Sequence, residues 1–154
     1  MKLAEALVLR ADLQKRVELL RSRLVESAKV QEGEKPPEEP GMLFRELDQA
    51  ISQLGRLIPQ INRLNLQTQL PDDGRTLTEA LTQRDMLTLR QSVLKSVLEG
   101  ASTKADRYSR TEIRYQATVE VAQLRQEYDS LAVQRRELDT LIQATNWMTD
   151  FVAA

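Results

Sequence analysis

The sequence predicts an all-α protein, an antiparallel four-helix bundle of long, coiled-coil-like helices with one short strand or hairpin. Apolar residues recur at alternating steps of three and four in four long segments, which is typical of amphipathic helices. Pro and Gly residues gather between these segments, where they end helices. Hydrophobic residues are 41% and charged residues 29% of the 154 residues, a composition suited to folding. We therefore expect a single helical domain over residues 1–154.

The first helix is expected at about 2–29, and the acidic, Pro-rich linker 30–41 ends it. Its apolar stripe includes one basic residue and comprises Leu3, Ala6, Arg10, Leu13, Val17, Leu20 and Leu24. The second helix is expected at about 40–66, because proline is tolerated in a first turn. It carries a heptad seam of Leu43, Leu47, Ala50, Leu54, Leu57, Ile61 and Leu64. Pro59 clashes with the carbonyl of Gly55, so we expect a kink without a break.

The third helix is expected at about 76–102, after a turn over residues 71–74. Thr76 followed by Glu79 is a capping-box signature. The flanks of that turn, including residues 66–70, suit a small hairpin. The fourth helix is expected at about 120–149. Four helices of similar length, each roughly 40 Å long, favour an up-down-up-down bundle.

A short strand is expected at about 112–119, where apolar and polar residues alternate. A single strand cannot satisfy its own backbone hydrogen bonds. Three partners are open: the extended residues 30–32, the 66–70 segment, or the same strand of another subunit.

Composition excludes several classes of function. The chain has no Cys and no His, so disulfides, thiolate nucleophiles, zinc–thiolate sites and histidine bases are absent. Its 22 basic and 23 acidic residues argue against binding nucleic acid by bulk charge. No apolar run is long enough to span a membrane, and Glu5 comes too early for a signal peptide. We expect a cytoplasmic protein without cofactor or metal, and not an enzyme.

Polar residues interrupt the apolar stripes near one end of the expected bundle. Arg10 and Arg84 lie about 10 and 12 Å from that end by helical rise. The layer formed there contains Arg10, Asn62, Arg84, Asp85, Asn146 and Trp147. One interpretation is a structural layer that sets helix register, with Asp12 and Asp85 pairing with the arginines. A second is a small-anion or small-ligand pocket with Trp147 as a wall. A third is that the stripe twists, so that these residues are simply exposed.

Basic and aromatic residues alternate between residues 104 and 115. This pattern can bind single-stranded nucleic acid through Arg107, Tyr108, Arg110 and Arg114. A simpler interpretation is that this basic segment pairs with the acidic linker 30–41, which lies at the same end of the expected bundle.

Apolar residues outside the main stripes suggest further helix–helix contacts. They include Leu7, Leu9 and Val25 on the first helix and Ile51 and Ile58 on the second. The third helix carries a row of Met86, Leu89, Val93 and Val97, away from its core stripe. A stripe wider than one bundle needs predicts an interface, and therefore a homo-oligomer.

Six segments have a familiar pattern: residues 1–7, 10–16, 28–34, 73–78, 107–110 and 146–147. Together they resemble a family of small bacterial proteins labelled septicolysin-like. The resemblance covers nearly the whole chain and implies a largely uncharacterised, all-helical, oligomeric protein. We therefore expect a non-enzymatic interaction or assembly protein, with ligand binding at the polar layer and binding of single strands at residues 104–115 as alternatives.

Overall fold

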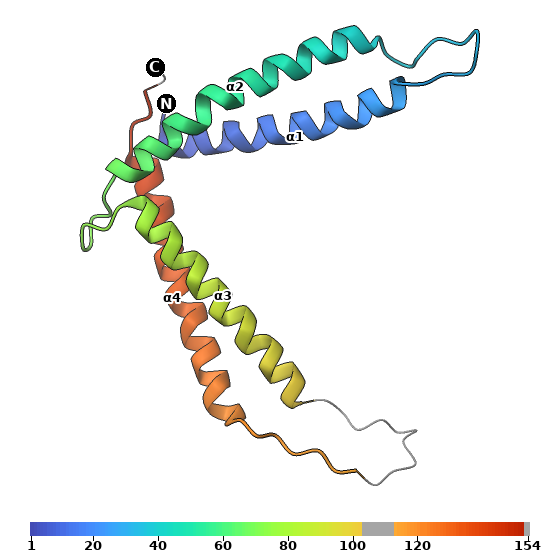
Figure 1. Ribbon diagram of the computed structural model, residues 1–154. Helices are drawn as coiled ribbons and strands as arrows, with labels where there is room; N and C mark the ends of the chain where they lie inside the picture. Colours follow the sequence, from blue (N-terminus) through green and yellow to red (C-terminus); the bar gives the residue numbers. More distant parts are fainter. Residues whose placement is uncertain (103–112, 153–154) are drawn as a thin grey trace. The chain divides into compact units, whose positions relative to one another are not determined.

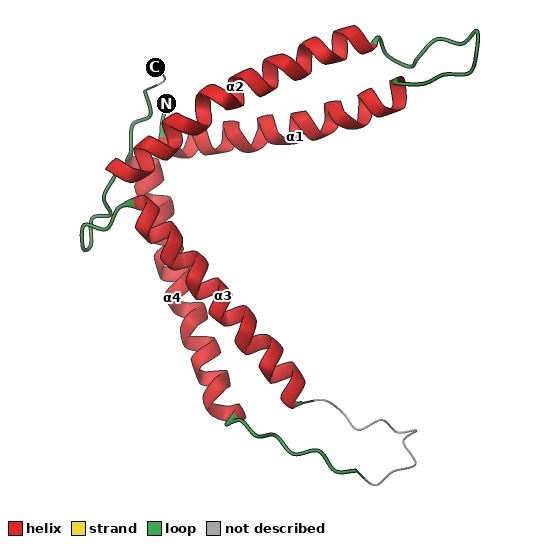
Figure 2. Cartoon of the chain, in the orientation of Figure 1, coloured by secondary structure: helices red, strands yellow, loops and turns green. Residues whose placement is uncertain are grey.

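The computed structural model describes residues 1–102 and 113–152. These parts of the chain contain four helices: α1 (Leu3–Ser27), α2 (Pro40–Gln67), α3 (Leu77–Ala101) and α4 (Val121–Met148) (Figure 1). Each helix ends within two residues of the range expected from the sequence. The prediction of an all-α protein is confirmed, and loops connect the helices (Figure 2).

The chain divides into two compact units. The first contains residues 1–69 and the segment from residue 144 onward, and the second contains residues 70–143. The sequence predicts one domain in which four stripes share a core. Within each unit the hairpin neighbours pack on each other, α1 on α2 in the first unit and α3 beside α4 in the second (Figure 1).

The α1–α2 hairpin buries the apolar stripes that the sequence indicates. Its buried side chains include Leu13, Leu20, Leu43, Ala50, Leu57 and Ile61. Two ion pairs hold the antiparallel register: Arg16 to Glu46 at 3.3 Å, and Arg23 to Glu38 with a 2.8 Å bond from Nε. α2 begins at Pro40 and passes through Pro59 without ending, as expected.

The turn before α3 has the predicted chemistry. The amide of Leu70 donates to the carbonyl of Arg75 at 2.7 Å, and Gly74 has a φ of 78°, which favours glycine. The capping box is confirmed, because the amide of Glu79 donates to Thr76 Oγ1 and the amide of Thr76 donates to Glu79 Oε2. The buried side chains of this unit include Leu77, Ala80, Leu94, Leu131, Leu138 and Ile142.

A short backbone clasp joins the two ends of the described chain within the first unit. The amide of Leu3 donates to the carbonyl of Thr149 at 2.9 Å, and that of Phe151 donates to Met1 at 2.8 Å. Lys2 and Asp150 form an antiparallel bridge, with 2.7 Å between their side chains. Phe151 is 3% exposed, so the clasp also buries a large apolar side chain.

The expected strand at 112–119 is not found. Residues 113–119 are all exposed and have no strand geometry, and residue 112 lies outside the described residues. The partners expected within the chain are engaged in other structure. Residues 31–34 form a turn, in which the amide of Glu34 donates to the carbonyl of Gln31. In the 66–70 segment, Leu66 lies in the last turn of α2 and Leu70 pairs with Arg75 across the turn before α3.

Candidate functional site

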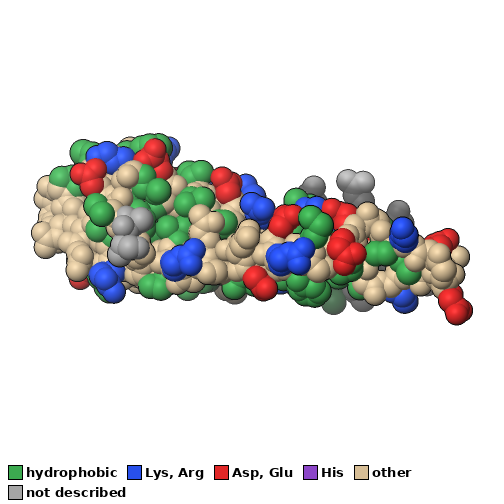
Figure 3. Space-filling model, turned by 90° about the horizontal axis from the view of Figure 1, so that it is seen from above, with side chains coloured by type: hydrophobic (Ala, Val, Ile, Leu, Met, Phe, Trp, Pro, Cys, Tyr) green, Lys and Arg blue, Asp and Glu red, His purple; other side chains and the backbone are tan. Residues whose placement is uncertain are grey.

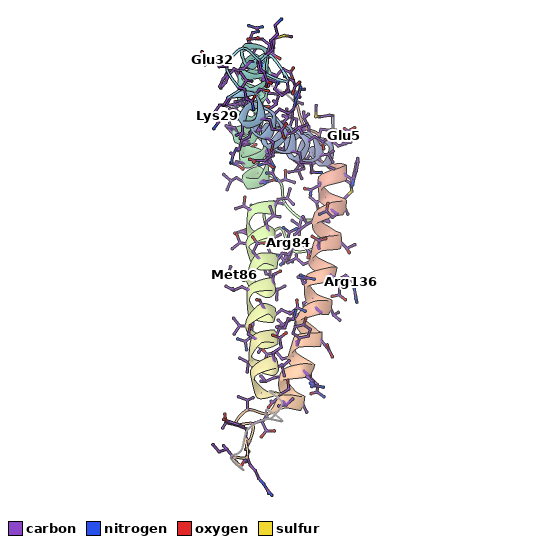
Figure 4. The ribbon with its side chains drawn as sticks, turned by 90° about the vertical axis from the view of Figure 1, so that its right-hand side faces the viewer. Glu5, Lys29, Glu32, Arg84, Met86 and Arg136 are labelled. Atoms are coloured by element: carbon purple, nitrogen blue, oxygen red, sulfur yellow. The ribbon has the colours of Figure 1, made fainter. Side chains whose placement is uncertain are left out.

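The second unit pairs Arg84 with a carboxylate that the sequence interpretation missed. Arg84 Nη1 donates to Asp139 Oδ1 at 2.8 Å, whereas Asp85 lies 3.8 Å away and forms a weaker ion pair. In Figure 4, Arg84 lies between α3 and α4. Because Asp139 already balances its charge, this guanidinium serves the α3–α4 contact before it serves an anion.

The first unit contains the other four residues of the expected layer. Asn146 is 4% exposed, but Asn62 is exposed and Trp147 is 57% exposed. Arg10 is half-buried, and its Nε is a buried donor without a hydrogen-bond partner in the part of the chain that the structure describes. Asp12, the partner expected for it, is exposed. Arg10 is therefore the residue of this layer whose hydrogen bonding is incomplete.

The expected nucleic-acid segment falls largely outside the described residues. Arg107, Tyr108 and Arg110 lie there. Arg114 is described and is exposed, and the neighbouring Tyr115 is 81% exposed.

A shallow cleft of about 260 Å³ opens in the second unit beside the turn that precedes α3. It is lined by Asp72, Arg75, Gln83, Leu87, Gln134, Glu137, Leu138 and Leu141. Arg75 is engaged within the turn, with Nη2 at 3.0 Å from Asp72 and Nε at 2.9 Å from Asp73. Hydrogen bonds from the backbone and the side chain of Arg75 lower the pKa of Asp73, and those to Asp73 and Asp72 raise the pKa of Arg75. This cluster stabilises the turn and leaves no free cation for an anionic ligand.

Neither a metal centre nor a membrane span occurs in the part of the chain that the structure describes. Within residues 1–102 and 113–152, acidic side chains nowhere gather into a group of three that could hold a metal ion. The helices of the same residues also lack an apolar stretch sufficient to cross a bilayer.

The exposed apolar row on α3 is the clearest surface feature of the second unit. Met86, Leu89, Val93 and Val97 are 54%, 57%, 54% and 37% exposed. Figure 4 shows Met86 on the side of α3 that faces away from α4. The spacing of three and four residues places the other three on the same side, because a helix turns once in 3.6 residues. We call these four residues the α3 row.

The α1–α2 hairpin also leaves apolar side chains in solvent. Phe44 and Ile51 are 54% and 51% exposed, and Ile58 is half-buried. Leu7 and Leu9 of α1 are half-buried, while Val25 is 71% exposed. Green hydrophobic side chains also reach the surface between charged ones on the face of the molecule shown in Figure 3.

Comparison with known proteins gives relatives whose roles are themselves open. A solved structure is similar over 99% of this chain and 99% of its own, with a TM-score of 0.91 and 38% sequence identity. It is described as a functionally unknown conserved protein from Corynebacterium diphtheriae. The comparison with curated proteins found no match. A family model matches residues 10–151, and the chain therefore belongs to the family of unknown function DUF6847.

Proposed function

We propose that this protein is a non-enzymatic, self-associating assembly protein, and that the α3 row is a surface on which it meets a second copy of itself. The observation that carries the proposal is the exposure of Met86, Leu89 and Val93 by half or more. Single exposed apolar residues are ordinary, but a continuous row on one helix face is typical of an interaction site.

The helix itself supports this assignment, because α3 is apolar on two opposite faces. Leu77, Ala80 and Leu94 are buried in the second unit, and Arg84 beside them pairs with Asp139. The α3 row lies on the other side of the helix. A helix that packs on one neighbour needs a single apolar stripe, so the second stripe is available for a further helix.

Charges beside the row favour a second copy of α3 in parallel orientation. With Met86 and Val93 at heptad position a and Leu89 at d, Asp85 takes position g, whereas Arg90 and Val97 take position e at the edge of the seam. In a parallel pair, Asp85 of one copy then lies beside Arg90 of the other, twice by symmetry. An antiparallel pair would bring Asp85 near Glu99 of the second copy. Arg90 already pairs with Glu127 at 2.6 Å and Asp85 lies 3.8 Å from Arg84, so the contact between copies would share these groups with partners inside the chain.

Light scattering after size exclusion, over a wide range of protein concentration, tests the proposal. We expect the mass to exceed that of one chain and to fall on dilution. Val93→Ser should shift the dissociation to higher concentration. Val133→Ser is the matched control, because Val133 is a 40% exposed valine of the same unit outside the row. A single-chain mass at every concentration would contradict self-association, and equal effects of the two variants would contradict the α3 row.

Packing of all four helices into one antiparallel bundle stays a prediction, as does the resemblance to septicolysin-like proteins. A pair of spin labels, one on α1 and one on α3, would test the bundle by measuring the distance between the two helices. The sequence has no cysteine, so labels would attach only at the two introduced cysteines.

A further inference from the structure

The two sides of the α1–α2 hairpin differ in chemistry. On one side, Arg16 and Arg23 of α1 reach across to Glu46 and Glu38. Residues seven apart lie on nearly the same side of a helix, so Arg10, Val17 and Leu24 form the opposite edge of the α1 stripe. That edge therefore faces the side of the hairpin away from the ion pairs.

α2 contributes a second heptad seam to this same side. Its packed seam contains Leu43, Leu47, Ala50, Leu54 and Leu57, and the adjacent seam contains Phe44, Leu47, Ile51, Leu54 and Ile58. Both have the alternating spacing of a coiled coil, and they share Leu47 and Leu54. The first seam is used against α1, whereas Phe44 and Ile51 of the second are half exposed. We call this apolar side of the hairpin, with Val17 and Leu24 of α1, the open side.

We infer that the open side packs against the open side of a second copy, so that two α1–α2 hairpins form an intermolecular four-helix bundle in which α1 of each copy lies on α2 of the other. The inference rests on the proposed self-association and names a second surface for it. A two-helix hairpin with one apolar side is half of such a bundle, and the same side of another copy supplies the missing half.

Charge selects this crossed arrangement. The Arg16–Glu46 and Arg23–Glu38 pairs place Asp48 level with residue 14, about one helical turn from Arg10. Asp48 lies on α2 at the outer flank of the second seam, is exposed, and has no ion pair among the described residues. When α1 lies on α2 of the second copy, Arg10 comes within reach of Asp48 of that copy. The buried Nε of Arg10 has no acceptor among the described residues, and the guanidinium to which it belongs would gain one in this arrangement.

The alternative arrangement is disfavoured by the same charges. Arg21 on the same flank is already paired with Glu18 at 3.2 Å, so Arg10 carries the charge that remains. If α1 lay on α1 of the second copy in parallel, Arg10 would face Arg10 of that copy at the same level. Like charges at a helix interface select against that partner arrangement. The crossed arrangement instead puts Arg10 beside the flank of α2 that contains Asp48.

Exchanging the two charges tests the inference in the full-length protein. We expect Arg10→Glu and Asp48→Arg each to weaken self-association by roughly tenfold, since each leaves like charges facing across the interface. The double variant R10E/D48R restores opposite charges only in the crossed arrangement. Its dissociation constant, measured by sedimentation equilibrium, should return to within roughly threefold of that of the unchanged protein.

A second variant keeps the test valid if a charge change harms folding. Ile51→Ser should weaken self-association, whereas Ile113→Ser should not, because Ile113 is a 59% exposed isoleucine outside both surfaces. Circular dichroism of each variant checks that its helices are intact. Failure of the double variant to restore association, or an Ile51→Ser protein that associates normally, would overturn the open-side interface. If Val93→Ser still weakened self-association in that case, the α3 row would remain supported. A single-chain mass at all concentrations would refute both the α3 row and the open side as interfaces.

Discussion

Replacing Leu20 by alanine probes the α1–α2 core, and the adjacent Leu19 supplies a matched control. Leu20 is 1% exposed and Leu19 is 58% exposed. The change removes about three methylene equivalents at ~0.8 kcal/mol each, or about 2.4 kcal/mol of burial. The remaining cavity raises the loss at Leu20 to about 3 kcal/mol. At Leu19 the side chain is already largely in water, so we expect a change within about 0.5 kcal/mol.

Urea unfolding followed by circular dichroism measures both free energies. For a chain of this size, a loss of about 3 kcal/mol corresponds to a Tm lower by roughly 6–12 °C. Both leucines lie in α1, so the comparison holds even if the two units unfold in separate transitions. Equal effects of Leu19→Ala and Leu20→Ala would refute the assignment of the buried face of α1. A larger effect at Leu19 would place the core on the face of α1 that contains Leu19, roughly 100° away around the helix.

Two further predictions concern glycines and acid. Gly74 has a φ of 78°, so Gly74→Ala should lower the free energy of unfolding by about 1–2 kcal/mol. Gly55 lies inside α2, and a Cβ added there would meet no described side chain within 4 Å, so Gly55→Ala should raise it by about 0.5–1 kcal/mol. Changes of the same sign in urea unfolding would refute this reasoning. Hydrogen bonds from the backbone and side chain of Thr76 lower the folded-state pKa of Glu79. A hydrogen bond from the side chain of Arg23 lowers that of Glu38. The stability they contribute is present above the unfolded pKa of a glutamate and is lost as pH falls through the lower folded pKa. Glu79→Gln should reduce the fall in stability below about pH 4.5, and an unchanged acid profile would contradict the cap.

The sequence was sufficient for the helices because their signals are local. The Thr76–Glu79 box and Pro40 mark helix starts within a few residues, and such signals depend little on the rest of the fold. The strand prediction failed because it rested on the alternation of apolar and polar side chains in residues 113–119. A strand also needs the backbone of a second strand beside it for hydrogen bonding.

The candidate site was less predictable because it depends on contacts between helices. Spacing along α3 places Arg84 on the core stripe, but only the pairing of α3 with α4 brings Asp139 to it. The sequence interpretation chose Asp85, the next residue along the chain, which forms the longer contact. The α3 row was indicated correctly, because a second stripe on one helix is visible from periodicity alone.

The clasp between residues 1–3 and 149–151 bears on the order in which the chain folds. Contacts inside each helical hairpin join residues close in sequence, and such contacts form quickly. The clasp must instead close a loop of nearly the whole described chain, and the entropy lost in closure is recovered only after the hairpins have shortened that loop. The two backbone hydrogen bonds of Leu3 and Phe151 are therefore among the last to form. By the same reasoning they are among the first to open, and the burial of Phe151 is a late event that reports completion of the first unit.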